Sequence, residues 1–223
     1  MPVITIVGAG PGLGASIART FGKNGFQVAL VSRSQGKLDA IAAALNAEGI
    51  EAAGFAADLT DPATLVEAFQ RIKDRFGGVD VLEFSPAVHA QGTPLDMVGP
   101  LEVTAENLQP QIDFYLYGAV AAAAQVLPDM LKSGSGTLLF TTGGGSVDPN
   151  PMMGNVNAAA AALRNWVLNL HQVVAEKGVY AAHVAISAWI GHGNPEAEPD
   201  VIAQAYYDLY TARDRAELHY VAM

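Results

Sequence analysis

A cluster of glycines near the start of the chain is the pattern with the clearest chemical meaning. Gly8, Gly10, Gly12 and Gly14 alternate with other residues in one short segment. Glycine readily adopts positive φ values and lets a ligand approach the main chain without a Cβ in the way. A helix that begins directly after such a turn directs unpaired N–H groups and the positive end of its dipole toward it. The segment therefore predicts a binding site for a pyrophosphate group.

The residues on either side of the glycines supply the elements that such a site needs. The apolar run Val3–Val7 indicates a buried strand, and residues 15–21 indicate the first turns of a helix. The spacing does not fit G-x-G-x-x-G, because Leu13 occupies the last position, but residues 8–14 do fit G-x-x-x-G-x-G. A glycine-rich turn without a ligand is the alternative interpretation.

This pattern resembles that of the short-chain dehydrogenase/reductase family, and the similarity extends over residues 3–186. The resemblance implies an α/β Rossmann fold, in which a doubly wound parallel sheet lies between two layers of helices. It also implies an oxidoreductase that binds a nicotinamide dinucleotide through the glycine turn and the ends of the next three strands. On this basis the residues expected to bind the cofactor are Gly8, Gly10, Gly12, Leu13, Gly14, Ser32, Arg33, Asp58, Leu59 and Ser85.

Two of these positions bear on which dinucleotide is bound. In the family, the residue matching Asp58 meets the adenine ring, and the end of the second strand reads the ribose 2′-position. An acidic residue there would hydrogen-bond a free 2′-hydroxyl and repel a phosphate. This chain has Ser32 and Arg33 instead, and the guanidinium offers a fork of donors that suits a 2′-phosphate. We therefore expect NADP to be preferred, with NAD as the alternative.

The residues that would carry out the chemistry depart from the family pattern. Members usually have a Tyr-x-x-x-Lys pair, in which the tyrosine moves a proton and the lysine lowers the tyrosine pKa from about 10. The matching positions here are Val156 and Ala160, and neither side chain can carry a proton. The family's serine is matched by Thr142, which keeps a hydroxyl, and its helix-four asparagine by Tyr115. Thr142 and Tyr115 are therefore the candidate catalytic residues.

The cofactor-binding residues follow the family pattern and the catalytic residues do not. Two functions fit this combination. In the first, the chain is an oxidoreductase for a small carbonyl or alcohol, with Asn155 or Asn157 as further contacts to the substrate or ribose. In the second, it binds NADP(H) without turnover and acts as a sensor or regulatory protein, since a fold does not by itself fix an activity. His89 and His192 lie in loops expected to border the site and are minor candidates for substrate contact.

Strand-like and helix-like segments alternate along the whole chain, which predicts one α/β domain over residues 1–223. Asp61 and Pro62 are expected to begin a helix that Gly77 ends, and Thr104 is expected to begin another. The strands are expected at residues 3–7, 26–31, 51–56, 79–84, 137–141, 179–186 and 217–221, and later helices at residues 36–47, 62–76, 104–131, 156–177 and 200–213.

Composition limits the class of partner. The 223 residues carry a net charge of −10, which argues against nucleic acid because phosphate backbones need a basic surface. The chain has no cysteine, which excludes thiol catalysis, and its five histidines have no metal-ligand spacing. We expect a cytoplasmic protein with neither a secretion signal nor a membrane span. Small residues suggest close helix pairing in a homo-oligomer, a dimer or tetramer; they are Ala119, Ala122, Ala123, Ala158 and Ala162.

Overall fold

Seven parallel strands form one sheet in the order β3-β2-β1-β4-β5-β6-β7. The structure, a computed structural model, describes residues 1–87 and 93–222. Every neighbouring pair is parallel, so the carboxyl ends of the strands lie along one edge. The predicted doubly wound parallel sheet is confirmed. The strands are Val3–Val7 (β1), Gln27–Ser32 (β2), Ala52–Ala56 (β3), Val81–Phe84 (β4), Gly136–Gly143 (β5), Val179–Ala188 (β6) and Glu217–Ala222 (β7).

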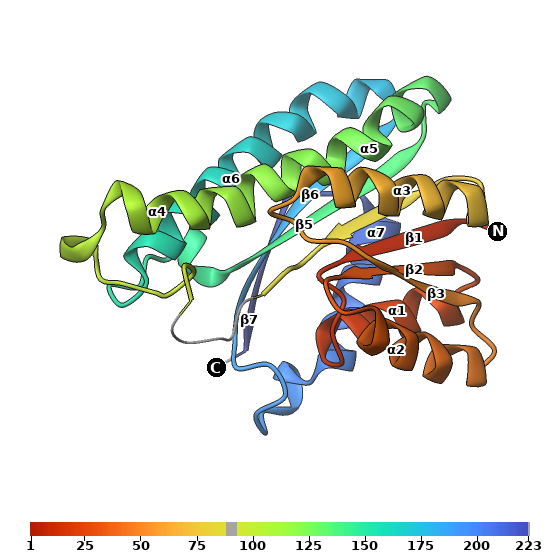
Figure 1. The fold of residues 1–223 in the computed structure, drawn as a ribbon, viewed down its shortest axis with the longest axis horizontal. Coiled ribbons are helices and arrows are strands. Elements are labelled where there is room, and N and C mark those ends of the chain that lie inside the picture. The colour runs from red at the N-terminus through yellow and green to blue at the C-terminus, as the bar shows by residue number, and fades with distance from the viewer. Residues whose placement is uncertain (88–92, 223) are drawn as a thin grey trace.

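Helices cover both faces of the sheet (Figure 1). Helices α1, α2 and α7 pack on one face, and α3, α5 and α6 pack on the other. The α-helices are Leu13–Lys23 (α1), Gln35–Ala47 (α2), Pro62–Phe76 (α3), Ala105–Gln111 (α4), Gly118–Ser133 (α5), Gly154–Val174 (α6) and Pro199–Ala212 (α7). Short 3-10 turns lie at Pro100–Glu102, Gly144–Ser146, Ala175–Lys177 and Pro195–Ala197, and a π-helical turn lies at Ile112–Tyr117.

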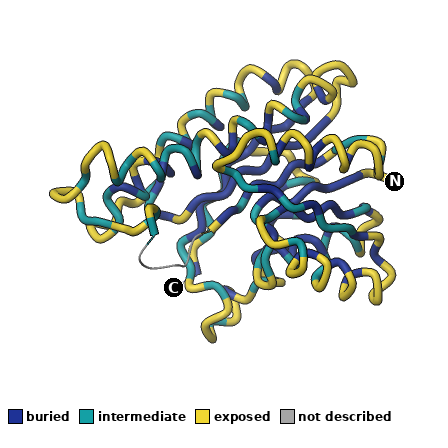
Figure 2. Tube along the Cα trace, viewed as in Figure 1, coloured by how far each residue is buried: buried dark blue, intermediate teal, exposed yellow. Residues whose placement is uncertain are grey.

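The strands are the most buried part of the molecule, because helices remove both of their faces from water (Figure 2). On the α1 side, Ile4 and Ile6 of β1 pack with Phe21, and on the α5 side Val7 packs with Phe84 and Phe140. Near-continuous apolar strands are typical of parallel sheets for this reason. Two strands break the rule with a fully buried ionisable residue, Glu83 in β4 and His183 in β6.

Local sequence signals predicted several helix ends correctly. The Asp61 carboxylate accepts the Ala63 N–H at 3.1 Å, Pro62 is the first residue of α3, and Gly77 ends that helix with a φ of 89°. Thr104 caps α4 through the Asn107 N–H. These predictions are confirmed, and each rests on a contact between residues close in sequence.

The long helix expected over residues 104–131 is confirmed as one continuous helical stretch, Ala105–Ser133, although its hydrogen bonding changes along its length. The structure divides it into α4, the π-helical turn Ile112–Tyr117 and α5. Pro110 lies inside α4 and lacks the N–H that would continue the regular hydrogen-bond ladder, and the wider turn follows directly. Other boundaries shift by a few residues: β5 and β6 are longer than predicted, β4 is shorter, and α6 ends at Val174.

One stretch is long and apolar enough to cross a membrane by length and composition alone. It is Ala105–Ser133, with a mean hydropathy of 1.2. Its apolar residues Phe114, Ala119 and Val126 are buried, and the last two pack in the α5 side of the core. The core helix of a globular protein meets the same criterion.

The turn after β1 depends on a close approach between two segments of main chain. Gly8 has a φ of 97°, and its N–H and that of Ala9 both donate to the Val31 carbonyl at 2.9 and 3.0 Å. A Cβ on Gly8 would lie 2.5 Å from the Pro86 nitrogen and Cα. Only glycine therefore lets the end of β1 lie this close to the segment that follows β4.

We expect Gly8→Ala to lower the free energy of unfolding by about 2 kcal/mol more than Gly25→Ala does. Gly25 is a matched control, because its φ of 89° gives similar backbone strain while its Cβ would meet nothing within 4 Å. Urea denaturation of the two variants measures the difference. Equal losses would contradict a steric requirement for glycine at residue 8.

Candidate active site

The strand order reverses between β1 and β4, and the candidate site lies at the carboxyl ends of these strands. The chain moves from β1 outward to β2 and β3, then returns to place β4 on the other side of β1. Connections leave the two strands in opposite directions at such a point, which opens a crevice where α/β proteins bind ligands. The glycine turn and Ser85–Pro86 lie beside each other there.

The glycine turn leads into a helix whose first N–H groups have no side-chain partner. Helix α1 begins at Leu13, and Gly12, at its N-cap position, offers no capping side chain. The first turn of α1 holds no acidic residue. A Cβ on Gly10 or Gly12 would meet nothing within 4 Å, so the main chain there faces open space, whereas a Cβ on Gly14 would lie 3.1 Å from the Ala9 Cα. These features fit a pyrophosphate held by main-chain N–H groups.

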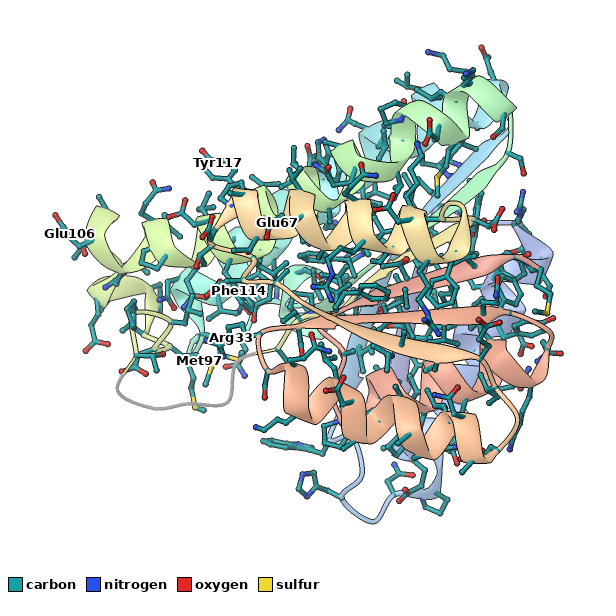
Figure 3. All side chains as sticks on the ribbon, turned by 45° about the vertical axis from the view of Figure 1, so that its right-hand side comes forward. Arg33, Glu67, Met97, Glu106, Phe114 and Tyr117 are labelled. Carbon is teal, nitrogen blue, oxygen red and sulfur yellow. The ribbon has the colours of Figure 1, made fainter. Side chains whose placement is uncertain are left out.

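The residues expected to bind the adenosine end of a dinucleotide follow strands β2 and β3. Ser32 ends β2 and pairs with Ala56 of β3, and Arg33 follows with an exposed side chain. Figure 3 shows Arg33 beyond the end of its strand, on the same side of the sheet as Met97. Among the described residues no carboxylate lies within 4.0 Å of the Arg33 guanidinium, so it is available to an anionic ligand.

Asp58 is held in place by its own turn. Its Oδ1 accepts the Thr60 N–H at 2.9 Å and the Thr60 hydroxyl at 2.7 Å. These two hydrogen bonds, with a smaller contribution from Arg33, hold the pKa of the Asp58 carboxyl below its usual value. The neighbouring Leu59 is half-buried and packs with the α5 side of the core. A fixed carboxylate beside an apolar side chain suits the amino group and the ring of an adenine.

Ser85 does not present its hydroxyl to the crevice. It donates to Glu83 Oε2 at 2.9 Å, and the Thr141 hydroxyl lies 3.2 Å from the other Glu83 oxygen and 2.6 Å from the Tyr206 hydroxyl. Glu83 is fully buried under α7, and burial raises its pKa to about 8. Any contact from Ser85 to a cofactor would therefore use its main chain.

Thr142 lies near the carboxyl end of β5 at the centre of a hydrogen-bonded cluster. Its hydroxyl is 2.8 Å from the Ser146 hydroxyl and 2.9 Å from Nε2 of His183. On the other side of the ring, His183 Nδ1 is 2.9 Å from Glu217 Oε1, and both Glu217 oxygens accept hydrogen bonds from Arg164. The sequence analysis did not identify His183, Glu217 or Arg164. A histidine inside the apolar run of β6 was the only signal for them.

Tyr115 lies in the π-helical turn, with its ring edge-on to Phe114 at a centroid distance of 5.1 Å. Burial raises the pKa of its hydroxyl, which makes the phenol a weaker acid. Among the described residues no cation pairs with it. The structure therefore gives Tyr115 none of the assistance that lysine gives to tyrosine in the family pattern.

The asparagines at the start of α6 have structural roles. The buried Asn155 accepts the Val98 N–H at 3.1 Å and donates to the carbonyls of Asp96 and Asn107. Asn157 is also buried and donates to the Asn150 carbonyl at 2.9 Å. The expectation that Asn155 contacts a ligand was wrong, because its amide already joins three segments of chain.

The remaining candidates give no second catalytic group. Val156 is half-buried and Ala160 is buried, so α6 presents no proton carrier at these positions. His192 is exposed, and His89 lies outside the described residues. Within residues 1–87 and 93–222, no group of three or more histidine or acidic residues could hold a metal.

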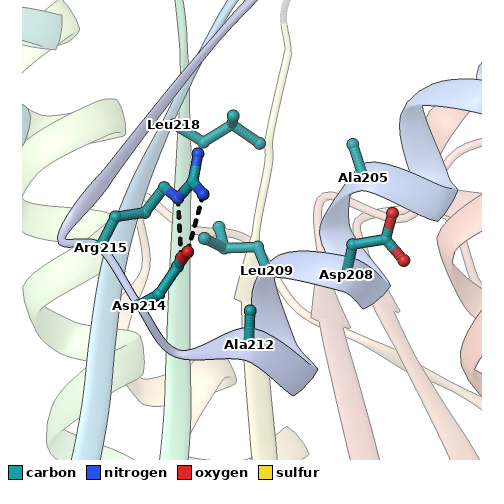
Figure 4. Close-up of a pocket in the computed structure, with 7 residues that line it drawn as sticks. All are labelled: Ala205, Asp208, Leu209, Ala212, Asp214, Arg215 and Leu218. Atoms are coloured by element: carbon teal, nitrogen blue, oxygen red, sulfur yellow. Dashed lines mark hydrogen bonds and ion pairs between the residues drawn. The ribbon is translucent and has the colours of Figure 1, made fainter.

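A separate shallow hollow lies between the end of α7 and the start of β7 (Figure 4). Arg215 and Asp214 form a two-fold hydrogen-bonded ion pair on its wall, with both distances 2.7 Å. Because β7 begins there, the hollow is at the amino ends of the strands. It is therefore at the opposite end of the strands from the glycine turn.

The model of the short chain dehydrogenase family matches residues 2–189. This chain belongs to that family. An oxidoreductase of Staphylococcus saprophyticus is 25% identical over 185 residues, covering 82% of this chain and 76% of the relative. Oxidoreductase UcpA of Escherichia coli is 30% identical over 147 residues, covering 65% of this chain and about half of the relative, 53%. These relatives support an oxidoreductase activity.

Solved structures share the whole fold. A variant of actinorhodin polyketide ketoreductase with NADPH superposes with a TM-score of 0.88 at 19% identity, covering 99% of this chain and 96% of that one. A metagenomic short-chain oxidoreductase in complex with NADP gives 0.84 at 24% identity, covering 100% and 97%. At these identities the comparison shows a shared fold.

Glu83 gives the stability of the protein a specific dependence on pH. Its pKa is about 8 in the folded state and near 4.5 in the unfolded chain, so only the unfolded state loses this proton between those values. The contribution of Glu83 to stability is complete below pH 4.5 and is lost as the pH rises toward 8. We expect the stability of the wild type relative to Glu83→Gln to fall by up to about 1.4 kcal/mol per pH unit across this range.

Urea denaturation from pH 5 to 9 measures this difference. Glu67→Gln is the matched control, because Glu67 is exposed on α3 (Figure 3) and its removal should leave the pH dependence of the wild type unchanged. Parallel stability curves for the wild type and Glu83→Gln would contradict a buried carboxyl with a raised pKa.

Proposed function

We propose that this protein is an oxidoreductase that prefers NADP(H) and acts on a small carbonyl or alcohol substrate. The observation that carries the proposal is the glycine turn, which meets an uncapped α1 at the point where the strand order reverses. The first N–H groups of α1 would hold the pyrophosphate, Asp58 and Leu59 the adenine, and Arg33 a 2′-phosphate. The bound dinucleotide would accept or donate a hydride at its nicotinamide ring.

The substrate would bind among loops that follow β4, β5 and β6. These loops carry exposed apolar side chains, with Leu101 100%, Trp189 80%, Met152 75% and Met97 59% exposed. Such side chains on the loops at the carboxyl ends of the strands favour a substrate with an apolar portion. Thr142, whose hydroxyl is also hydrogen-bonded to Ser146 and His183, would contact the substrate oxygen at the base of this region.

The second candidate function is binding of NADP(H) without turnover, in a sensor or regulatory protein. Val156 and Ala160 favour it, because they remove the usual proton carriers while leaving the cofactor half complete. The hydroxyl cluster around Thr142 favours the enzyme. Turnover of any alcohol or ketone by the purified protein would decide between them.

We propose a cytoplasmic homo-oligomer. Three of the five small residues that suggested helix pairing between chains are instead buried in the core of this chain. These three are Ala119, Ala122 and Ala123. The other two, Ala158 and Ala162, are at least partly exposed on α6. Exposed apolar side chains on α5, on α6 and at the end of the π-helical turn favour pairing through these helices; they are Tyr117, Val120, Leu131 and Val173.

We expect Arg33→Ala to weaken NADPH binding roughly 10- to 100-fold while changing NADH binding less than about threefold. The reason is that the guanidinium would form charge-assisted hydrogen bonds only with the 2′-phosphate. Titration calorimetry with both dinucleotides measures the effect. Arg75→Ala is the control, since Arg75 is exposed at the far end of α3. Equal weakening of both cofactors would remove the role given to Arg33.

We expect Tyr115→Phe to lower kcat/KM by no more than roughly tenfold, as for the loss of one neutral hydrogen bond. The effect should lie mainly in KM, because burial makes this phenol a poor proton donor. Steady-state kinetics over pH 6 to 9 provide the measurement. A loss of turnover of a hundredfold or more would assign proton transfer to Tyr115 instead.

A further inference from the structure

The cluster around Thr142 continues as a chain of hydrogen bonds from β5 to α6 and β7. From Ser146 it passes through the Thr142 hydroxyl and the His183 ring to the Glu217 carboxylate, with successive distances of 2.8, 2.9 and 2.9 Å. Arg164 closes the chain with two hydrogen bonds to Glu217. The β5–β6–β7 register brings these groups together, because Phe140 pairs with His183, and His183 pairs with Glu217.

The partners of each group determine where the protons lie. Hydrogen bonds from Arg164 and His183 lower the pKa of Glu217, so this carboxylate is ionised and can only accept. The His183 Nδ1 must then carry a proton. Burial lowers the pKa of His183, so the ring is neutral near pH 7 and its Nε2, 2.9 Å from the Thr142 hydroxyl, has a lone pair that can accept the hydroxyl proton. The Gly143 carbonyl, 3.1 Å from the same hydroxyl, is the other acceptor within reach. A hydroxyl, an imidazole and a carboxylate so ordered form a general-base arrangement.

We propose that Thr142, His183 and Glu217 form a proton relay that replaces the missing tyrosine–lysine pair. This inference rests on the proposed function. In alcohol oxidation the substrate C–H bond gives its electron pair to the nicotinamide as a hydride. The substrate O–H proton passes to Thr142 Oγ1 as the Thr142 proton passes to His183 Nε2. One carbonyl, one reduced nicotinamide and one imidazolium result, and reduction of a carbonyl reverses each transfer.

The surroundings of the relay suit this role. Thr142 and Ser146 are 4% and 7% exposed and His183 is fully buried, which keeps bulk water away from the ring. The ionic groups that face His183 are Arg164 from α6 and Glu217 from β7, and His219 of β7 also acts on it electrostatically. Apolar side chains would often stabilise a sheet–helix interface as well as this partly buried charged set does. Thr142 would be the catalytic residue, and His183 and Glu217 would act through it.

The variants Thr142→Val, Thr142→Ser and His183→Asn separate the relay from a structural role. We expect Thr142→Val and His183→Asn to lower kcat for oxidation of a panel of secondary alcohols roughly 100-fold or more, with KM changed less than about threefold. Thr142→Ser should restore kcat to within about tenfold of the wild type. His171→Asn is the matched control. His171 is on α6, where its ring is hydrogen-bonded to the Ala181 carbonyl of β6, and it lies outside the relay.

The pH profile supplies a readout that a structural role would not change. The wild-type kcat should fall at acid pH as His183 takes up one proton, and His183→Asn should lose this dependence. Nitrogen NMR of the cofactor-free protein provides a second readout, independent of turnover. It should find His183 neutral at pH 7 with its proton on Nδ1, and His183→Asn identifies the signal by its disappearance.

If the protein turns over an alcohol, three results would overturn the relay. They are a proton on Nε2 of His183, an unchanged acid limb in His183→Asn, and a Thr142→Val variant with near wild-type kcat. If His183→Asn does not fold, the Thr142 variants and the wild-type spectra still decide. Absence of NADP(H) binding in calorimetry would instead overturn the proposed function, and binding without turnover of any alcohol would overturn the relay and favour the non-catalytic binder.

Discussion

The whole arrangement depends on how closely the turn after β1 approaches the chain that follows β4. Gly8 takes a positive φ and leaves no room for a Cβ against Pro86, while its N–H and that of Ala9 tie the turn to the end of β2. This packing fixes the direction of α1 relative to the sheet. The start of α1 then faces the crevice with its N–H groups free of side-chain caps. A ligand site made of main chain is thereby held by main-chain packing.

Strands β4, β5 and β6 differ from this main-chain site, because they carry buried polar side chains on both faces of the sheet. Glu83, Thr141 and Tyr206 lie on the α7 side, and Thr142 and His183 lie on the α6 side. Neighbouring residues of β5 point to opposite faces, so Thr141 and Thr142 belong to separate networks. Desolvation makes both networks costly. Thr141 and Thr142 lie near the carboxyl end of β5, where parallel sheets carry function.

Sequence reasoning succeeded where the structure depends on short-range rules. The glycine turn, the Asp61 and Thr104 caps and the Gly77 stop each involve a few consecutive residues, and the apolar strands follow from burial on both faces. It predicted the helix after Thr104 but not the π-helical turn within it, because spacing and capping do not reveal such a turn. It also failed for Asn155, whose amide bonds to residues as many as 59 positions away.

The relay residues were beyond the reach of sequence patterns for the same reason. His183 lies 41 positions from Thr142 and 34 from Glu217, so only the register of three strands brings them together. The family pattern directed attention to Val156 and Ala160 on α6, where the usual groups are absent. The structure instead places an imidazole and a carboxylate beneath that helix.

The central claim is that the free start of α1 binds the pyrophosphate of a nicotinamide dinucleotide. Titration calorimetry of NADPH with the wild type and Gly12→Asp tests it most directly. A Cβ at residue 12 would meet nothing within 4 Å, so the aspartate side chain has room there, and a thermal melt shows whether the variant is folded. We predict one NADPH site per wild-type chain and a loss of affinity of at least about 100-fold in the variant, because its carboxylate takes the N–H groups and repels phosphate. No binding by the wild type, or equal binding by a folded Gly12→Asp, would contradict this account.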